Sequence, residues 1–131
     1  MKPLKRGIDT LLAEAKGSVR AIEATEAVKL LGDPAWLIVD VRDAGERARD
    51  GFIPHSFHCP RGMVEFWIDP DSPYFKQQFG TAQNLLFHCA ADWRSMLTVH
   101  TVTRMGVEHA FHLAGGLKAW KDAGGPITCK T

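Results

Sequence analysis

One stretch of the sequence decides the fold: Leu85-Leu86-Phe87-His88-Cys89-Ala90-Ala91-Asp92-Trp93-Arg94-Ser95. It opens with an apolar run of strand length, typical of a strand covered on both faces of a sheet. A short turn follows the cysteine, and an amphipathic helix begins near Ser95. That helix carries Met96, Val99, Val102 and Met105 on one stripe, and Gly106 is expected to end it. The stretch therefore predicts a strand, a loop and a helix in immediate succession.

Two other apolar runs extend this pattern to a whole sheet. Residues 36–41 form a continuous apolar run, and residues 110–113 follow the predicted helix. Strands and helices that alternate at this spacing imply parallel strands joined by right-handed crossovers. We therefore expect an α/β fold, a three-layer sandwich with a mainly parallel central sheet and helices on both faces.

The remaining chain fits around this sheet as one domain. Ile8, Leu11, Leu12 and Ala15 recur at helical spacing, so residues 1–17 are predicted to form an N-terminal helical extension that ends at Gly17. Residues 18–131 are predicted to form the domain itself, with a short strand at 19–22, a helix at 25–31 and short helices and loops at 60–80. The sequence has no internal repeat, linker or low-complexity segment.

The composition excludes several classes of function. The 131 residues fit one domain, and a net charge of +1 provides no basic field for nucleic acid or an acidic membrane. No apolar run approaches the roughly 18 residues that span a bilayer. No signal-peptide pattern follows the basic start, so we expect a cytoplasmic protein. The cysteines Cys59, Cys89 and Cys129 are odd in number and widely spaced, so a disulfide framework is not expected.

Cys89 is the strongest candidate for chemistry. It ends a buried strand, and the carboxyl ends of strands are where open α/β sheets bind ligands. The loop that follows would direct backbone N–H groups at the sulfur, the helix N-terminus adds a positive partial charge, and Arg94 adds a full one. Such surroundings favour a reactive thiolate. The alternative at this point is a buried strand-end cysteine that packs as a small hydrophobic residue.

Four motifs in register resemble single-domain rhodaneses. They are Leu37-Ile38-Val39-Asp40-Val41-Arg42-Asp43, Gly51-Phe52-Ile53-Pro54, Cys89-x4-Arg94-Ser95 and Gly115-Gly116-Leu117-Lys118-Ala119-Trp120. Their order and spacing match that family from about residue 19 to about residue 125. The resemblance implies a rhodanese-like sandwich and a sulfurtransferase activity.

The resemblance also implies a mechanism and its site. Cys89 would take sulfur from thiosulfate or another sulfane donor as a persulfide, and cyanide, a thiol or a protein sulfur acceptor would collect it. The active-site loop would consist of Ala90, Ala91, Asp92, Trp93, Arg94 and Ser95, whose N–H groups supply the preorganised donors that a negative sulfur needs. No organic cofactor, metal, nucleic acid or membrane is implied, and the histidines form no recognisable ligand pair.

Two other functions remain open at this point. The related phosphatase branch of this fold, like arsenate-reductase-like enzymes, would use the same thiolate, but its loop has one residue more between cysteine and arginine. Here four residues separate Cys89 from Arg94, which favours a single sulfur atom over phosphate. The second alternative is a non-catalytic module that docks partners or senses oxidation at Cys89.

Several other side chains carry expectations of their own. Asp92 stands where glycine is common in the family, which suggests a positive φ and a carboxylate that opposes an anionic donor. Arg61 is a further candidate for substrate contact. Arg42 is expected to pair with Glu46, and Arg47 to lie on a solvated helix face.

Overall fold

The computed structural model describes residues 1–130, and its centre is a parallel sheet. The sheet has five strands in the order β1-β5-β4-β2-β3, and every neighbouring pair is parallel. The strands are β1 Ala21–Ile22, β2 Trp36–Asp40, β3 Phe57–His58, β4 Asn84–His88 and β5 Ala110–Leu113. The expected α/β class and parallel sheet are confirmed.

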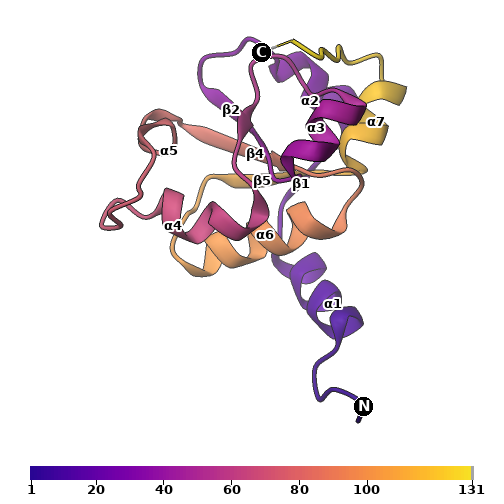
Figure 1. The fold of residues 1–131 in the computed structure, drawn as a ribbon, viewed down its shortest axis with the longest axis vertical. Coiled ribbons are helices and arrows are strands. Elements are labelled where there is room, and N and C mark those ends of the chain that lie inside the picture. The colour runs from indigo at the N-terminus through magenta and orange to yellow at the C-terminus, as the bar shows by residue number, and fades with distance from the viewer. Residues whose placement is uncertain (131) are drawn as a thin grey trace.

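Helices cover both faces of this sheet. They are α1 Ile8–Ser18, α2 Ala24–Ala27, α3 Ala44–Asp50, α4 Val64–Ile68, α5 Gln77–Thr81, α6 Trp93–Arg104 and α7 Gly116–Asp122, with short 3-10 turns at Val28–Leu30 and Arg61–Met63. Figure 1 shows α2, α3 and α7 on one side of the sheet and α4 and α6 on the other, with α1 beyond α6. The three-layer arrangement is therefore as expected. Within residues 1–130, every helix is too short or too polar to cross a bilayer.

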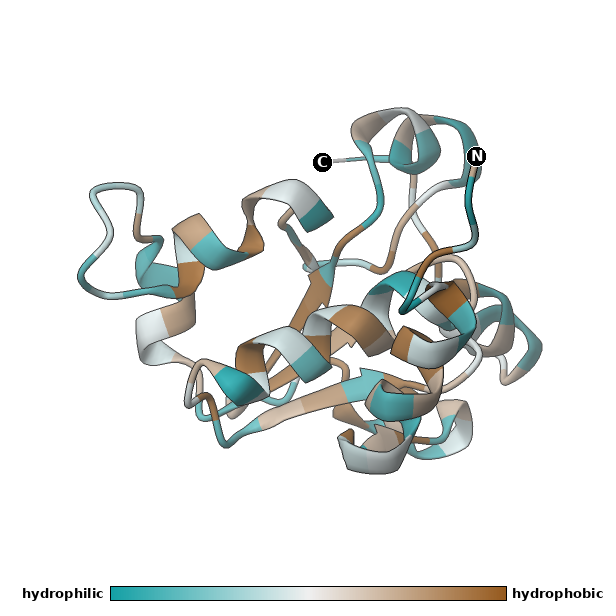
Figure 2. Cartoon of the chain, turned by 90° about the horizontal axis from the view of Figure 1, so that it is seen from below, coloured by the Kyte–Doolittle hydropathy of each residue, from teal (hydrophilic) through white to brown (hydrophobic). Residues whose placement is uncertain are grey.

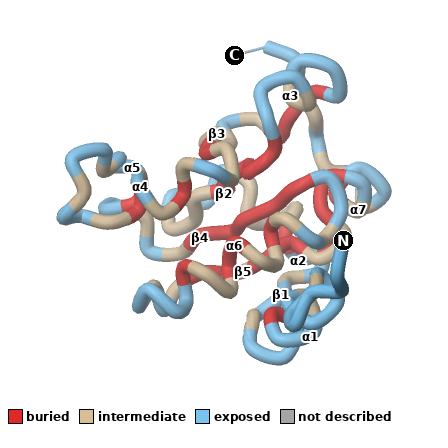
Figure 3. The backbone as a smooth tube through the Cα atoms, turned by 60° about the horizontal axis from the view of Figure 1, so that its bottom comes forward, coloured by how far each residue is buried: buried red, intermediate tan, exposed pale blue. Residues whose placement is uncertain are grey.

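Alternating side chains of the central strands fill two cores. Leu85 and Phe87 of β4 point to the α6 side and pack with Val99 and Val102, whereas Leu86 packs with α2 and α7 on the other side. The hydropathy colours in Figure 2 show the strands as the most apolar part of the chain. Figure 3 shows that most of the burial in the sheet lies in β2, β4 and β5, whereas β1 and β3 at its edges are less buried. A strand covered on both faces explains the unbroken apolar run that the sequence displays.

Some boundaries differ from the sequence expectations. α1 continues through Gly17 and ends at Ser18, and the following strand has only two residues. Ala15 is the only buried side chain of α1, so Ile8 and Leu11 are exposed despite their helical spacing. Met105 is also exposed, since α6 ends at Arg104 and the stripe runs out with the helix.

The register brings the carboxyl ends of three strands together. Asp40 of β2 lies opposite His88 of β4, and Phe87 of β4 lies opposite His112 of β5. The segments that follow these residues therefore start at one edge of the sheet, with Cys89 between its two neighbours. This edge is the expected location for a binding site in a parallel sheet.

Candidate active site

Cys89 lies at the base of a hollow formed by its own loop. The hollow has a volume of about 240 Å³ and is lined by Cys89, Ala90, Ala91, Asp92, Trp93 and Arg94. Cys89 is 2% exposed, so its sulfur is largely shielded from solvent. The backbone N–H of Ser95 donates to the sulfur at 3.4 Å, and the Ser95 hydroxyl lies 3.5 Å from it. The first turn of α6 thus directs its positive end at the sulfur.

The start of α7 supports the loop from behind. The N–H of Leu117 donates to the Cys89 carbonyl at 2.9 Å, and the N–H of Lys118 donates to the Ala90 carbonyl at 3.3 Å. Gly116 makes this approach possible, with φ at +59° and space for no larger residue. A Cβ atom there would lie 2.4 Å from the Ala91 carbonyl oxygen and 2.6 Å from that of Cys89. The glycine pair expected to make a tight turn therefore also fixes the active loop.

A buried ion pair anchors the segment after β2. Arg42, 1% exposed, donates from Nε and Nη2 to the Asp40 carboxylate at 3.0 and 2.8 Å and from Nη2 to the Gly51 carbonyl. Burial alone would raise the pKa of Asp40, but hydrogen bonds from Arg42, together with the electrostatic effect of the nearby His88, hold it well below its ordinary value. Arg47 also donates to Asp40, at 2.8 Å, and is only 14% exposed. The expectations of an Arg42–Glu46 pair and a solvated Arg47 were wrong, because the buried Asp40 attracts both arginines.

Arg94 is held by a carboxylate from a distant part of the chain. Its guanidinium binds both oxygens of Glu46, at 2.6 and 2.9 Å. Glu46 is itself held by a capping box with Asp43 at the start of α3. The hydrogen bond from Arg94 lowers the pKa of Glu46 to about 2, and the same bond raises the pKa of Arg94. Arg94 therefore lines the mouth of the hollow with much of its charge neutralised, through a partner 48 residues away that no local pattern indicates.

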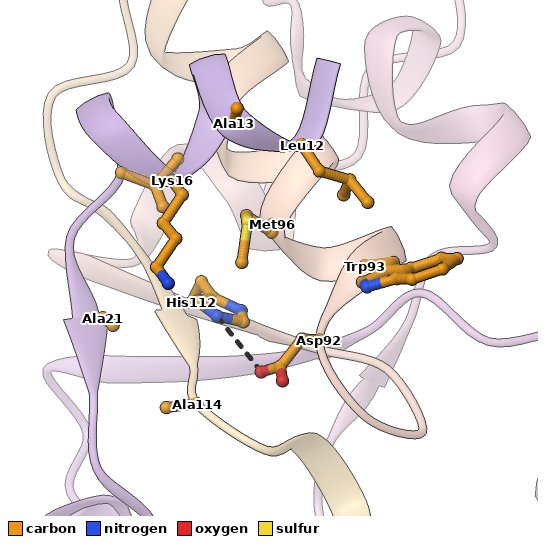
Figure 4. Close-up of a pocket in the computed structure, with 10 residues that line it drawn as sticks. Leu12, Ala13, Lys16, Ala21, Asp92, Trp93, Met96, His112 and Ala114 are labelled. Atoms are coloured by element: carbon orange, nitrogen blue, oxygen red, sulfur yellow. Dashed lines mark ion pairs between the residues drawn. The ribbon is translucent and has the colours of Figure 1, made fainter. Parts of the chain in front are cut away.

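Asp92 is oriented differently from the sequence expectation. Its φ is −126°, so no positive φ is needed there, and it directly precedes α6. The carboxylate accepts the N–H of Gly115 at 2.7 Å and lies 3.6 Å from His112 Nε2. Figure 4 shows it pointing toward His112, while the exposed indole of Trp93 stands at the rim. The carboxylate is thus engaged by β5 and its following turn, although Asp92 also lines the hollow above Cys89. The expectation of a positive φ was wrong, and the effect of the Asp92 charge on an anionic donor stays a prediction.

Arg61 is not brought to the hollow. Its guanidinium binds Glu65 at 3.0 Å and the Thr101 hydroxyl at 3.3 Å, and within residues 1–130 the side chains that line the hollow do not include it. Cys59 is fully buried, and burial raises the pKa of its thiol to about 12, whereas Cys129 is exposed. Over the same part of the chain, no cluster of three or more His, Cys, Asp or Glu side chains is arranged to hold a metal ion.

The family follows from a match over most of the chain. The family model described as the rhodanese-like domain matches residues 23–123. The chain belongs to the rhodanese-like domain family. The expected resemblance is therefore confirmed, and α1 precedes the matched segment.

Relatives of this rhodanese-like domain carry two kinds of description. A mouse protein called thiosulfate sulfurtransferase/rhodanese-like domain-containing protein 3 is 28% identical over 106 residues, which are 77% of this chain and 68% of the mouse protein. A solved structure from Rhodopseudomonas palustris is 45% identical, covers 98% of both chains and superposes with a TM-score of 0.92. That protein is of unknown function and is described as a possible tyrosine phosphatase.

More distant structures share the fold. A human single-domain sulfurtransferase is 21% identical and has a TM-score of 0.66 over 80% of this chain and 97% of its own. This likeness shows the architecture alone. The family match and the mouse relative together support a sulfurtransferase family for this rhodanese-like domain.

Proposed function

We propose that this domain is a sulfurtransferase in which Cys89 carries sulfane sulfur as a persulfide. One observation carries the proposal: the Cys89 thiol lies at the floor of a small hollow made of its own loop and accepts the N–H of Ser95. A hollow of about 240 Å³ has room for a small donor such as thiosulfate.

The transfer balances without a cofactor or a metal. The Cys89 thiolate attacks the outer sulfur of thiosulfate or another sulfane donor, and a new S–S bond forms. The S–S bond of the donor breaks, and sulfite or the corresponding leaving group departs with the electron pair. A thiol or cyanide then attacks the outer sulfur and restores the thiolate, which is nucleophilic catalysis in two steps. The Ser95 N–H is placed to stabilise the negative sulfur in each state. We place the reaction in the cytoplasm, where thiols remain reduced.

The state of Arg94 argues against a phosphatase. An arginine that recognises a phosphoryl group needs both arms of its guanidinium free for two oxygens. Here both arms bind Glu46, so a phosphate ester would have to displace that carboxylate. Four residues separate Cys89 from Arg94, one fewer than in the phosphatase branch, and this shorter loop leaves space for a single sulfur atom and not for a phosphoryl group. Because the Rhodopseudomonas relative is described as a possible tyrosine phosphatase, an activity assay should include an aryl phosphate beside the sulfur donor.

Intact mass spectrometry tests the proposal directly. After incubation with thiosulfate and removal of excess donor, the protein should gain about 32 Da, one sulfur on the nucleophile. The gain should vanish in Cys89→Ser and persist in Cys59→Ser and Cys129→Ser, which are matched controls because one thiol is buried and the other exposed. No added sulfur with any sulfane donor, together with hydrolysis of an aryl phosphate, would establish the phosphatase instead. If the protein carries out neither reaction, it would be a non-catalytic module.

A further inference from the structure

A chain of polar contacts leads from Cys89 to a histidine that the reaction above does not use. The Ser95 hydroxyl lies 3.5 Å from the Cys89 sulfur and 2.8 Å from His112 Nδ1. On its other side, His112 Nε2 lies 3.6 Å from an oxygen of Asp92. His112 is 2% exposed and Ser95 is fully buried. The Ser95 hydroxyl also lies 3.2 Å from the Asp92 backbone carbonyl oxygen, a second acceptor that is farther away than His112 Nδ1. Their order is thiol, hydroxyl, imidazole and carboxylate.

The donors and acceptors give this series of contacts from Cys89 to Asp92 a direction. A thiol S–H donates to the Ser95 oxygen, and the Ser95 O–H then donates to the free Nδ1 lone pair of His112. Neutral imidazole has one N–H, so Nε2 carries the proton and directs it toward the Asp92 carboxylate. Asp92 is fixed in that position because its oxygen also accepts the Gly115 N–H at 2.7 Å.

We propose that His112 acts through Ser95 as the proton acceptor for the Cys89 thiol, and that Asp92 stabilises the resulting imidazolium. The S–H bond breaks as its proton moves to the Ser95 oxygen, and the original hydroxyl proton moves to Nδ1. The products are a thiolate and an imidazolium, with no change in net charge and no further reactant. The new Ser95 O–H then donates to the thiolate. His112 is a positioning residue for the nucleophile, since it contacts neither the sulfur nor a substrate.

The surroundings of His112 suit this role. Burial lowers the pKa of His112 in spite of the opposing charge of Asp92, so the imidazole is neutral and able to accept a proton near neutral pH. Among the described residues, Asp92 lies 3.6 Å from His112, Lys16 of α1 lines the same hollow, and Cys89 is linked to it through Ser95. Arg20, which precedes β1, is instead stacked on Phe111.

A second hollow connects His112 with solvent. It has a volume of about 540 Å³, and its lining includes His112, Asp92, Trp93 and Lys16. Figure 4 shows the imidazole and the Asp92 carboxylate side by side in its wall. Asp92 and Trp93 also line the hollow above Cys89, so the relay crosses from one hollow to the other through the loop. A proton on His112 thus has a route to water that does not pass the bound donor.

The test measures the rate at which iodoacetamide alkylates Cys89 between about pH 5 and 10, followed by intact mass in a Cys59→Ser, Cys129→Ser background. The parent should show two steps, with a plateau between them in which Cys89 and His112 share one proton and part of the protein is the thiolate–imidazolium pair. His112→Asn keeps an acceptor for the Ser95 hydroxyl but takes up no proton. We expect a loss in rate at pH 7 of about a hundredfold, the lower end of general-base effects, and a single step at higher pH.

His100→Asn is the matched control, because His100 Nδ1 makes the same 2.8 Å contact with a serine hydroxyl, that of Ser18, at an exposed site. It should leave the profile unchanged. Ser95→Ala breaks the relay with a smaller change in volume and should give the same single step, and the double variant Ser95→Ala/His112→Asn should lose no more than either alone. Parent-like two-step profiles in His112→Asn or Ser95→Ala would overturn the relay, as would losses that add in the double variant.

The relay rests on the proposed nucleophile but not on its substrate. Alkylation needs no sulfur donor, so the two proposals fail separately. A protein that shows the two-step profile but gains no sulfur from any sulfane donor retains the relay and loses the sulfurtransferase assignment. If the parent gains sulfur at Cys89 and His112→Asn shows the same alkylation profile as the parent, the sulfurtransferase assignment stands and the relay is refuted.

Discussion

Replacement of Gly116 by alanine should disable the active loop more than it destabilises the fold. The backbone at Gly116 has φ +59°, a conformation that costs an L-residue about 1–2 kcal/mol. The added Cβ would also lie 2.4 Å from the Ala91 carbonyl oxygen, 2.6 Å from the Cys89 carbonyl oxygen and 2.8 Å from the Ala90 carbonyl carbon. All three are backbone atoms of the active loop, so no flexible side chain can relieve the overlap.

The magnitude follows from these distances. Overpacking of this kind costs about 1–3 kcal/mol, which with the φ cost lowers the free energy of unfolding by about 2–5 kcal/mol. Ordinary contact begins near 3.4 Å, so the Ala91 carbonyl must move by about 1 Å from its 2.4 Å position. A displacement of that size in a reacting group reduces the rate by about a hundredfold. The rate of persulfide formation should therefore fall by about that factor in protein that is still folded.

Gly32→Ala provides the matched control for this prediction. Gly32 has φ +85° with no atom within 4 Å of an added Cβ, and it precedes β2 at the opposite end of the sheet from Cys89. It should lose about 1–2 kcal/mol from the φ cost and keep its rate. Urea unfolding gives the stabilities, and intact mass at timed intervals gives the rates. Equal persulfide rates in the two folded variants would refute the view that close packing against Gly116 positions the loop.

Three further variants probe the charges around the site. Glu46→Gln removes the carboxylate that neutralises Arg94, so thiosulfate turnover at low salt should rise by up to about fivefold, because a surface ion pair is worth up to about 1 kcal/mol. The rate of sulfite release measures this gain, which should shrink as the salt concentration rises. Asp40→Asn should lower the free energy of unfolding at pH 7 by about 3–5 kcal/mol, because Arg42 would keep a buried charge without its partner. The pKa of Asp40 is held below its ordinary value, so its contribution is full above about pH 4 and is lost as the pH falls further, and urea titrations should converge for the two proteins in acid. Asp92→Asn should give no gain in sulfite release at low salt, since the carboxylate is engaged by a backbone N–H and an imidazole; a gain that salt abolishes would show that it faces the donor.

Local pattern was sufficient for the architecture. The buried strand, the loop and the helix around Cys89 are adjacent in sequence, so apolar run length and helical spacing predict them directly. The carboxyl end of a parallel strand then gives the position of Cys89 at the edge of the sheet. Where the local pattern was weak the prediction was wrong, as at Gly17, which lies inside α1, and at Met105, which lies beyond the end of α6.

The electrostatic surroundings of Cys89 were decided only by the tertiary structure. Glu46 reaches Arg94 across 48 residues, and His112 reaches Ser95 across 17. Such pairs depend on strand register and on which rotamer each side chain adopts, and neither leaves a periodic trace in the sequence. Asp92 illustrates the same limit, because its charge was readable from the sequence but the direction of its carboxylate was set by the N–H of Gly115 after β5. The sequence by itself thus determined the fold and the position of Cys89 at the edge of the sheet, whereas packing between distant strands decided which charged and titratable side chains surround that cysteine.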